Sequence, residues 1–155
     1  MSTPHTIRAN WRIDRGQDTV DGAGQAEVRT AAEVVRLIEA LAEPEADDAS
    51  LTHLGRPVVV VPLMGDAPVP DHVVHIAVRD GWGYLIYAGA SARHVDGFTG
   101  HPDGDPLSPG TYGSYDEYPA GSGLPLPRFT EVLTQFLATG ELSPDVPWVS
   151  QDALI

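Results

Sequence analysis

The chain contains no cysteine and no lysine, and basic residues of any kind are scarce. The absence of cysteine excludes disulfide bonds and thiolate metal sites, and it fits a reducing compartment. All nine basic residues are arginines, against 22 acidic residues, so the formal net charge is −13. A field of that sign repels nucleic acid and anionic membranes and attracts basic surfaces. We therefore expect a protein that binds neither nucleic acid nor membranes directly.

Long apolar runs are missing too. The longest, "VVVVPLM", is too short to span a bilayer. The opening residues, "MSTPHTIRANW", lack the basic segment and apolar run of a signal peptide. We therefore expect a cytoplasmic protein. Its 155 residues, 42% of them hydrophobic, suit one domain over residues 1–155 with a core of its own.

Two helices are marked by the residues at their ends. Thr30 and Glu33 form a capping box ahead of apolar residues at helical spacing, and Pro44 should stop that helix. The second helix has Pro127 in its first turn and Gly140 just past its end. Between these two residues, an apolar stripe recurs at helical spacing.

Strands are predicted from apolar runs and turn residues. We expect strands at residues 7–13, in "RPVVVVPLM", on both sides of an Asp80-Gly81 turn, at 110–121 and in "DVPWVSQ". The segments "DRGQDTVDGAGQ" and "EPEADDAS" are expected to be a turn-rich link and an acidic loop, and residues 89–110 a long loop. The fold class predicted is α+β: a single domain with a mainly antiparallel sheet of about five or six strands and two helices packed on one face.

No residue pattern indicates a catalytic or metal site. His72 and His75 share a predicted strand and should point to opposite faces, so they cannot bind one ion together. Ser91, His94 and Asp96 are the residue types of a hydrolytic triad, but no Gly-x-Ser-x-Gly elbow surrounds the serine. Asp96, Asp103 and Asp105 could offer oxygen ligands to calcium, although turn chemistry explains their spacing equally well. We expect no metal, no cofactor and no enzymatic activity.

The segment "GTYGSYDEYPAG" combines three tyrosines with two acids. Read as a strand, it places Tyr112, Asp116 and Tyr118 on one face and Tyr115 and Glu117 on the other. The tyrosines either pack the sheet, with their hydroxyls in water, or form a recognition patch. The pattern leaves both readings open.

The C-terminal third adds a resemblance to a known family. It reads Tyr112-Gly113, then "DEYP", "GLPLP", "RFTEVLTQFLATGE" and "PDVPWVSQ". This series resembles the first-numbered immunity-protein family of bacterial polymorphic toxin systems, most clearly over residues 82–151. The Glu117-Tyr118-Pro119 step replaces a simpler "EFP"-like step, and two residues separate the last Trp from Gln151.

The resemblance implies a cytoplasmic antidote that binds a cognate toxin, often one with a nucleic-acid deaminase domain, and covers its active site. Two alternatives stay open: a small stand-alone enzyme using Ser91, His94 and Asp96, or a regulatory binding module without a toxin partner. The expected toxin-binding residues are Tyr112, Tyr115, Asp116, Glu117, Tyr118, Asp96, Asp103 and Asp105.

Overall fold

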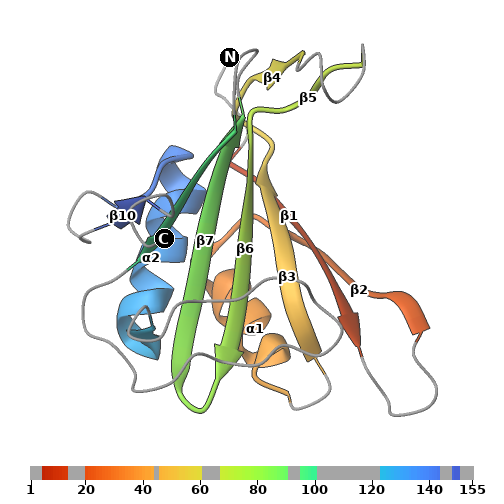
Figure 1. Ribbon diagram of the computed structural model, residues 1–155. Helices are drawn as coiled ribbons and strands as arrows, with labels where there is room; N and C mark the ends of the chain where they lie inside the picture. The colour runs from red at the N-terminus through yellow and green to blue at the C-terminus, as the bar shows by residue number, and fades with distance from the viewer. Residues whose placement is uncertain are drawn as a thin grey trace.

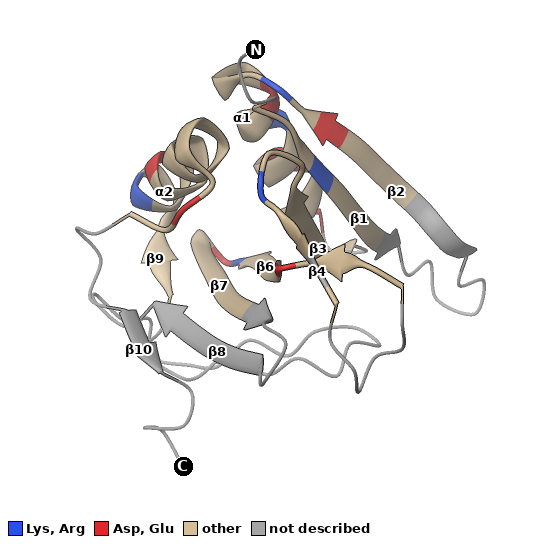
Figure 2. Ribbon diagram, turned by 90° about the horizontal axis from the view of Figure 1, so that it is seen from above, with Lys and Arg blue, Asp and Glu red and all other residues tan. Residues whose placement is uncertain are grey.

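The computed structural model describes residues 5–13, 20–43, 46–60, 67–90, 95–100, 123–143 and 148–150. Within them, one antiparallel sheet carries two helices on one of its faces (Figure 1; seen from above in Figure 2). The elements in chain order are β1 Ile7–Ile13, β2 Val20–Val28, α1 Ala31–Leu41, β3 Ala46–His53, β4 Val58–Val59, β5 Val69–Pro70, β6 His72–Arg79, β7 Trp82–Ala90, β8 Val95–Gly100, β9 Leu124–Pro125, α2 Leu126–Thr139 and β10 Trp148–Ser150.

The main sheet has eight strands in the described part of the chain. Their order is β10-β8-β7-β6-β3-β1-β2, and β9 pairs with β7. Six of them have six to nine residues, and β9 and β10 are short additions. Each neighbouring pair is antiparallel. The predicted α+β class, with a mainly antiparallel sheet under two helices, is confirmed.

Both helices have the ends that the sequence predicts. The hydroxyl of Thr30 accepts the N–H of Glu33 at 3.1 Å, and the Glu33 carboxylate accepts the N–H of Arg29 at 3.1 Å. Gly140 ends α2 with φ 76°, a conformation that costs glycine little. The core lies between the helices and the sheet. Its largest side chains are Phe129, Phe136, Ile7, Leu41 and Leu51.

The hairpin between β6 and β7 is also confirmed. Asp80 and Gly81 form its two-residue turn, with φ 52° and 85°. Two successive positive φ values match the twist of the flanking strands. The register pairs Arg79 with Trp82 and continues to His72 with Gly89.

Two segments predicted as irregular are strands instead. The expected link "DRGQDTVDGAGQ" and the expected acidic loop "EPEADDAS" contribute to β2 and β3, which flank β1. In β2, Gly24 pairs with Trp11, and the Trp11 ring occupies the space that a Cβ at position 24 would need. In β3, buried Ala49 and Leu51 alternate with half-buried Ser50, which is the period of a strand with one covered face. β8 likewise falls within the predicted loop at 89–110.

The prediction of a buried strand in "RPVVVVPLM" is wrong. Among its described residues, 56–60, only Val58 and Val59 form a strand, β4, and it pairs with β5 in a separate two-stranded sheet. Val58 is 62% exposed and Val60 is 45% exposed. Prolines at positions 57 and 70 supply no N–H, which limits further strand pairing here. We call residues 57–60 and 67–70 the valine ribbon. It lies beyond one end of the main sheet (Figure 1).

Candidate functional site

Nearly all of the residues named for a hydrolytic triad, a calcium site or toxin binding lie outside the described part of the chain. Asp96 is the exception, since its backbone lies in β8 opposite Gly89. The predicted tyrosine strand at 110–121 is not described. The other candidates outside the described residues are Ser91, His94, Asp103, Asp105, Tyr112, Tyr115, Asp116, Glu117 and Tyr118.

An ion pair closes the base of the valine ribbon. Arg56 precedes β4 and Asp71 follows β5. The Nε and Nη2 groups of Arg56 donate to Oδ1 and Oδ2 of Asp71 at 3.0 and 2.8 Å. The Asp71 N–H donates to the Pro57 carbonyl at 3.2 Å. A two-pronged pair of this kind fixes orientation as well as distance, so both ends of the ribbon are held together.

Two histidines continue the ion pair into the core. His72 Nδ1 lies 2.9 Å from Oδ1 of Asp71, and His72 Nε2 accepts the backbone N–H of His53 at 2.9 Å. His53 Nε2 lies 2.9 Å from the Leu137 carbonyl oxygen, and His53 Nδ1 accepts the N–H of Gly55 at 3.0 Å. Each ring therefore has one donating and one accepting nitrogen, which is the neutral form of histidine.

The same residues reach the end of α2. Arg56 Nη1 donates to the Gly140 carbonyl at 2.9 Å. The rings of His53 and His72 meet Phe136 edge-on, with centroids 5.5 and 5.8 Å apart. We call His53, Arg56, Asp71 and His72 the neck cluster. It ties the ends of β3 and α2 to the start of β6.

The ionisation of the neck cluster follows from burial and from its hydrogen bonds. Burial lowers the pKa of His72 below 6.5, and Asp71 only partly opposes that effect. Burial alone would raise the pKa of Asp71, but bonds from Arg56 and His72 outweigh it and hold that pKa below 3.8. The hydrogen bond to Asp71 raises the pKa of Arg56 above its usual value. Burial also raises the pKa of Tyr87, which stacks on His72.

These contacts make the neck cluster a clamp rather than a catalytic site. Both ring nitrogens of His53 and His72 and both carboxylate oxygens of Asp71 are engaged by protein groups. A general base needs a lone pair that substrate can reach, and the His72 side chain is 0% exposed. Our sequence reasoning missed this cluster. The sequence does hold one sign of it: polar residues stand on both sides of an apolar run, with His53 and Arg56 before the run and Asp71-His72 after it.

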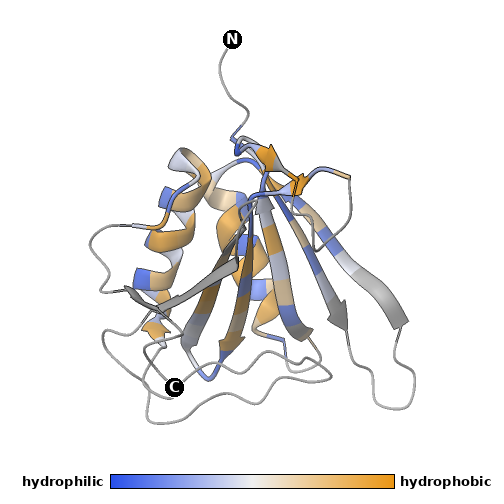
Figure 3. Ribbon diagram, turned by 45° about the horizontal axis from the view of Figure 1, so that its top comes forward, coloured by the Kyte–Doolittle hydropathy of each residue, from blue (hydrophilic) through white to orange (hydrophobic). Residues whose placement is uncertain are grey.

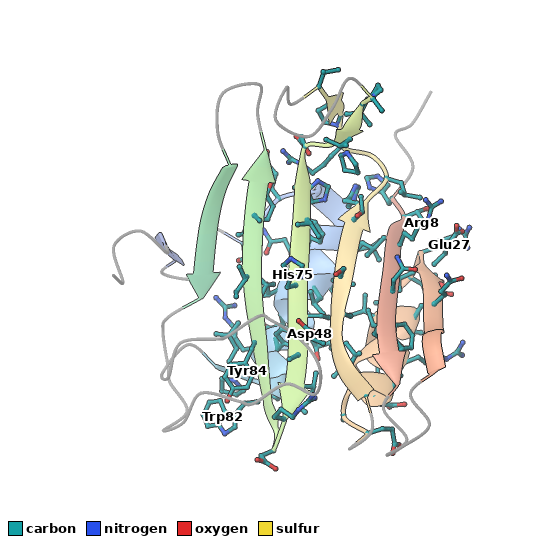
Figure 4. The ribbon with its side chains drawn as sticks, turned by 45° about the vertical axis from the view of Figure 1, so that its right-hand side comes forward. Arg8, Glu27, Asp48, His75, Trp82 and Tyr84 are labelled. Atoms are coloured by element: carbon teal, nitrogen blue, oxygen red, sulfur yellow. The ribbon has the colours of Figure 1, made fainter. Side chains whose placement is uncertain are left out.

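The prediction that His72 and His75 face apart is confirmed. His72 packs under α2, whereas His75 lies on the opposite face of the sheet, with Ser50 Oγ 3.4 Å from its Nδ1 (Figure 4). The 3.4 Å between Ser50 Oγ and His75 Nδ1 is longer than the distance of about 2.6–3.2 Å at which a histidine activates a serine nucleophile. Among residues with described side chains, no three His, Asp or Glu groups gather closely enough to hold a metal ion.

The face of the sheet opposite the helices changes character across its width. Over β1 and β2 it is exposed and charged: Arg8 lies 3.6 Å from Glu27, and a shallow hollow of about 350 Å³ is lined by both strands. Over part of β6 and β7 it holds a buried apolar cluster, in which Ala77, Tyr84 and Ile86 pack beside Trp82 (Figure 4). The charged edge offers paired ions that neutralise one another, which gives little local field for a charged ligand.

The valine ribbon is the most exposed apolar feature in the described residues. Three large hydrophobic side chains are exposed in the described part of the chain, and two of them, Val58 and Val60, belong to the ribbon. Every other ribbon residue with a described side chain is also apolar and exposed or half-buried. Figure 3 shows the two short strands as an apolar tip on the molecule. An apolar tip held on a rigid base is suited to contact another macromolecule.

The family described as "Immunity protein Imm1" matches residues 22–150. The chain therefore belongs to the Imm1 family of immunity proteins of polymorphic toxin systems, as the sequence resemblance predicts. Family membership indicates a protein that acts against a toxin by binding it, rather than an enzyme. No curated protein and no solved structure matches the chain.

Neither helix among the described residues has the length and apolar character needed to cross a membrane. The predicted cytoplasmic location therefore stays a prediction.

Proposed function

We propose that this protein is a cytoplasmic antidote that binds a cognate toxin domain of the nucleic-acid deaminase type and covers its active site. The observation that carries the proposal is the match to the immunity family over residues 22–150. The match does not identify the toxin or the mode of inhibition. We infer both from the net charge of the chain and from the residues of the tyrosine–acid segment.

The charge of the chain supports a nucleic-acid-directed toxin as the partner. An enzyme that acts on nucleic acid presents a basic surface to phosphates, and a net charge of −13 is complementary to such a surface. Deaminases of the zinc type use His and Cys ligands with a catalytic Glu. A chain without cysteine cannot supply the usual ligand set, so in this pair it takes the part of the inhibitor.

The tyrosine–acid segment supplies groups that resemble a single-stranded substrate. Deaminases stack a displaced base between aromatic or apolar walls. In the proposal, the carboxylates of Asp116 and Glu117 stand for phosphates, and the rings of Tyr112, Tyr115 and Tyr118 stand for bases. Tyrosine is also a common anchor at interfaces, because it buries a large area for little lost side-chain entropy. Asp96, Asp103 and Asp105 would add long-range attraction.

The reading frame next to this gene is where we expect the cognate toxin domain, and binding to that domain tests the proposal. We expect a tight complex that abolishes deamination of a single-stranded oligonucleotide, with inhibition competitive toward that oligonucleotide. Tyr115→Ala and Glu117→Ala should each accelerate dissociation and weaken binding by about thirtyfold, as truncation of a central anchor does. Thermal melts check that both variants stay folded.

Two results would count against particular parts of the proposal. Non-competitive inhibition would contradict active-site occlusion while leaving toxin binding intact. Parent-like binding by both folded variants would remove the tyrosine–acid segment from the interface. Purified protein should show no hydrolase or deaminase turnover alone, and turnover abolished by His94→Ala would instead establish the enzyme alternative.

A further inference from the structure

The valine ribbon has no role in the core and no charged residue, on a chain with a net charge of −13. Val58, at 62% exposure, is the most exposed large hydrophobic side chain in the described residues. Exposing valine to water forgoes burial worth about 25 cal/mol for each Å² of apolar surface. An exposed apolar patch at a defined place is typical of a surface that a partner covers.

The neck cluster gives the ribbon a fixed position. Arg56 and Asp71 close its base with two side-chain bonds, and the Asp71 N–H adds a third bond to Pro57. The register then pairs Val58 with Pro70 and Val59 with Val69. A segment that is held in one geometry loses little conformational freedom when it binds. The clamp therefore presents the apolar side chains ready for contact.

The backbone of the ribbon favours side-chain contact over addition of a further strand. Pro57, Pro68 and Pro70 have no N–H to donate, so the edges of β4 and β5 offer an incomplete ladder. This argues against a second copy pairing strand to strand. The net charge argues against a second copy more generally, because two chains of −13 repel each other. The net charge of the chain favours a basic partner instead.

We propose that the valine ribbon is an anchor for the cognate toxin domain, which it contacts through an apolar patch bordered by basic side chains. This inference rests on the proposed function and adds a second contact region to it. The ribbon supplies the apolar centre of the contact, and the net negative charge of the chain favours a basic border on the partner. The tyrosine–acid segment and the ribbon are then separate parts of one interface, each open to its own test.

The main test pairs a ribbon variant with a matched valine outside it. We would measure binding of the toxin domain encoded beside this gene to the parent, to the double variant Val58→Ser/Val60→Ser, and to Val35→Ser. Val35 is a 42% exposed valine on α1, so it controls for loss of exposed apolar surface. The double variant should bind about thirtyfold more weakly than the parent, and the control within about twofold.

A second pair of variants tests the basic border. Val58→Arg should weaken binding more than Val58→Asp, because only the arginine meets a border of like charge. Equal losses, or a larger loss with aspartate, would contradict the basic border. Hydrogen exchange on the parent provides a test without substitution: toxin should slow exchange in the peptide covering the ribbon, and unchanged exchange would overturn the anchor.

The remaining outcomes separate this inference from the proposed function. A parent that does not bind the toxin domain overturns the proposed function itself. A parent that binds, together with a folded double variant that binds equally well, overturns only the anchor. Sedimentation of the protein alone gives the last outcome: a dimer that the double variant splits would assign the ribbon to a second copy.

Discussion

Arg56 shows how one side chain can fix the relation between distant elements. Its guanidinium meets both carboxylate oxygens of Asp71 and the carbonyl of Gly140, 84 residues further along the chain. The two side chains are 24% and 12% exposed, so solvent screens their attraction only in part. We therefore expect the loss of one partner to cost more here than at an ion pair on the open surface.

Replacing Arg56 should destabilise the protein and loosen the valine ribbon. Arg56→Gln leaves the Asp71 carboxylate with one hydrogen bond from His72 and removes the tie to α2. We expect the free energy of unfolding to fall by about 2–3 kcal/mol, the range for charged hydrogen bonds in partly buried sites. Urea unfolding measures this change.

The control for Arg56 is Arg128→Gln. Arg128 pairs with Glu131 at 3.2 Å, with side chains 33% and 69% exposed. A pair on the surface should contribute about 0.5 kcal/mol or less. Equal effects of the two substitutions would show that the neck cluster is no stronger than a surface ion pair.

His72 makes stability depend on pH in a known direction. Its pKa in the folded protein lies below 6.5, chiefly through burial, and it is surrounded by His53, Arg56, Asp71 and Tyr87. As pH falls, His72 therefore gains its proton in the unfolded chain before it does so in the folded protein. The free energy of unfolding is highest above pH 6.5 and decreases below that pH. Asp71, whose pKa lies below 3.8, adds a further loss at more acidic pH.

The variant His72→Gln isolates this effect, because glutamine has no proton to gain. Its stability should be lower than that of the parent at pH 8, through lost packing. Between pH 8 and pH 5, however, the parent should lose more stability than the variant. Urea unfolding at the two pH values provides the comparison, and identical losses would show that His72 does not titrate with folding.

At the scale of elements, the sequence predicts correctly those helix ends and turns that depend on neighbouring residues. The capping box at Thr30, the end of α2 at Gly140 and the Asp80-Gly81 turn were all found in the sequence, because each depends on residues a few positions apart. Tertiary pairing decided the rest. The glycine-rich β2 became a strand because Gly24 makes room for the ring of Trp11 on the neighbouring strand.

The valine run shows the opposite error. Four valines predict a buried strand by composition, but burial depends on what covers the strand. The described part of the run, residues 58–60, lies beyond one end of the main sheet. The neck cluster was missed for a similar reason. His53 and His72 are 19 residues apart, and His53 and Leu137 are 84 apart, so no local pattern joins them.

Gly83 on β7 lies against the ring of Phe129 on α2. A Cβ at this position would fall on the ring of Phe129, which is 0% exposed. Gly83→Ala should therefore destabilise the protein by about 1–3 kcal/mol, as overpacking of a core does. Thermal or urea unfolding gives the value. Combining it with Phe129→Leu should cost less than the sum of the two single changes, and strict additivity would contradict the contact.

At the scale of the whole molecule, net charge and apolar contacts affect different steps of binding. The net charge of −13 acts over a distance of about 8–10 Å in ordinary salt and governs how fast a basic partner arrives. Apolar contacts act only after docking and govern how long the partner stays. In our proposals, the aspartates affect association, while the valine ribbon and the central tyrosine–acid residues affect dissociation.

The most direct test of the central claim is the salt dependence of binding between this protein and the toxin domain encoded beside its gene. We expect inhibition of the toxin with an association rate of about 10⁸ M⁻¹s⁻¹ at low salt, falling toward about 10⁵–10⁶ M⁻¹s⁻¹ as salt rises. The dissociation rate should change much less. Absence of binding, or association that salt leaves unchanged, would contradict an acidic antidote that acts on a basic, nucleic-acid-directed toxin.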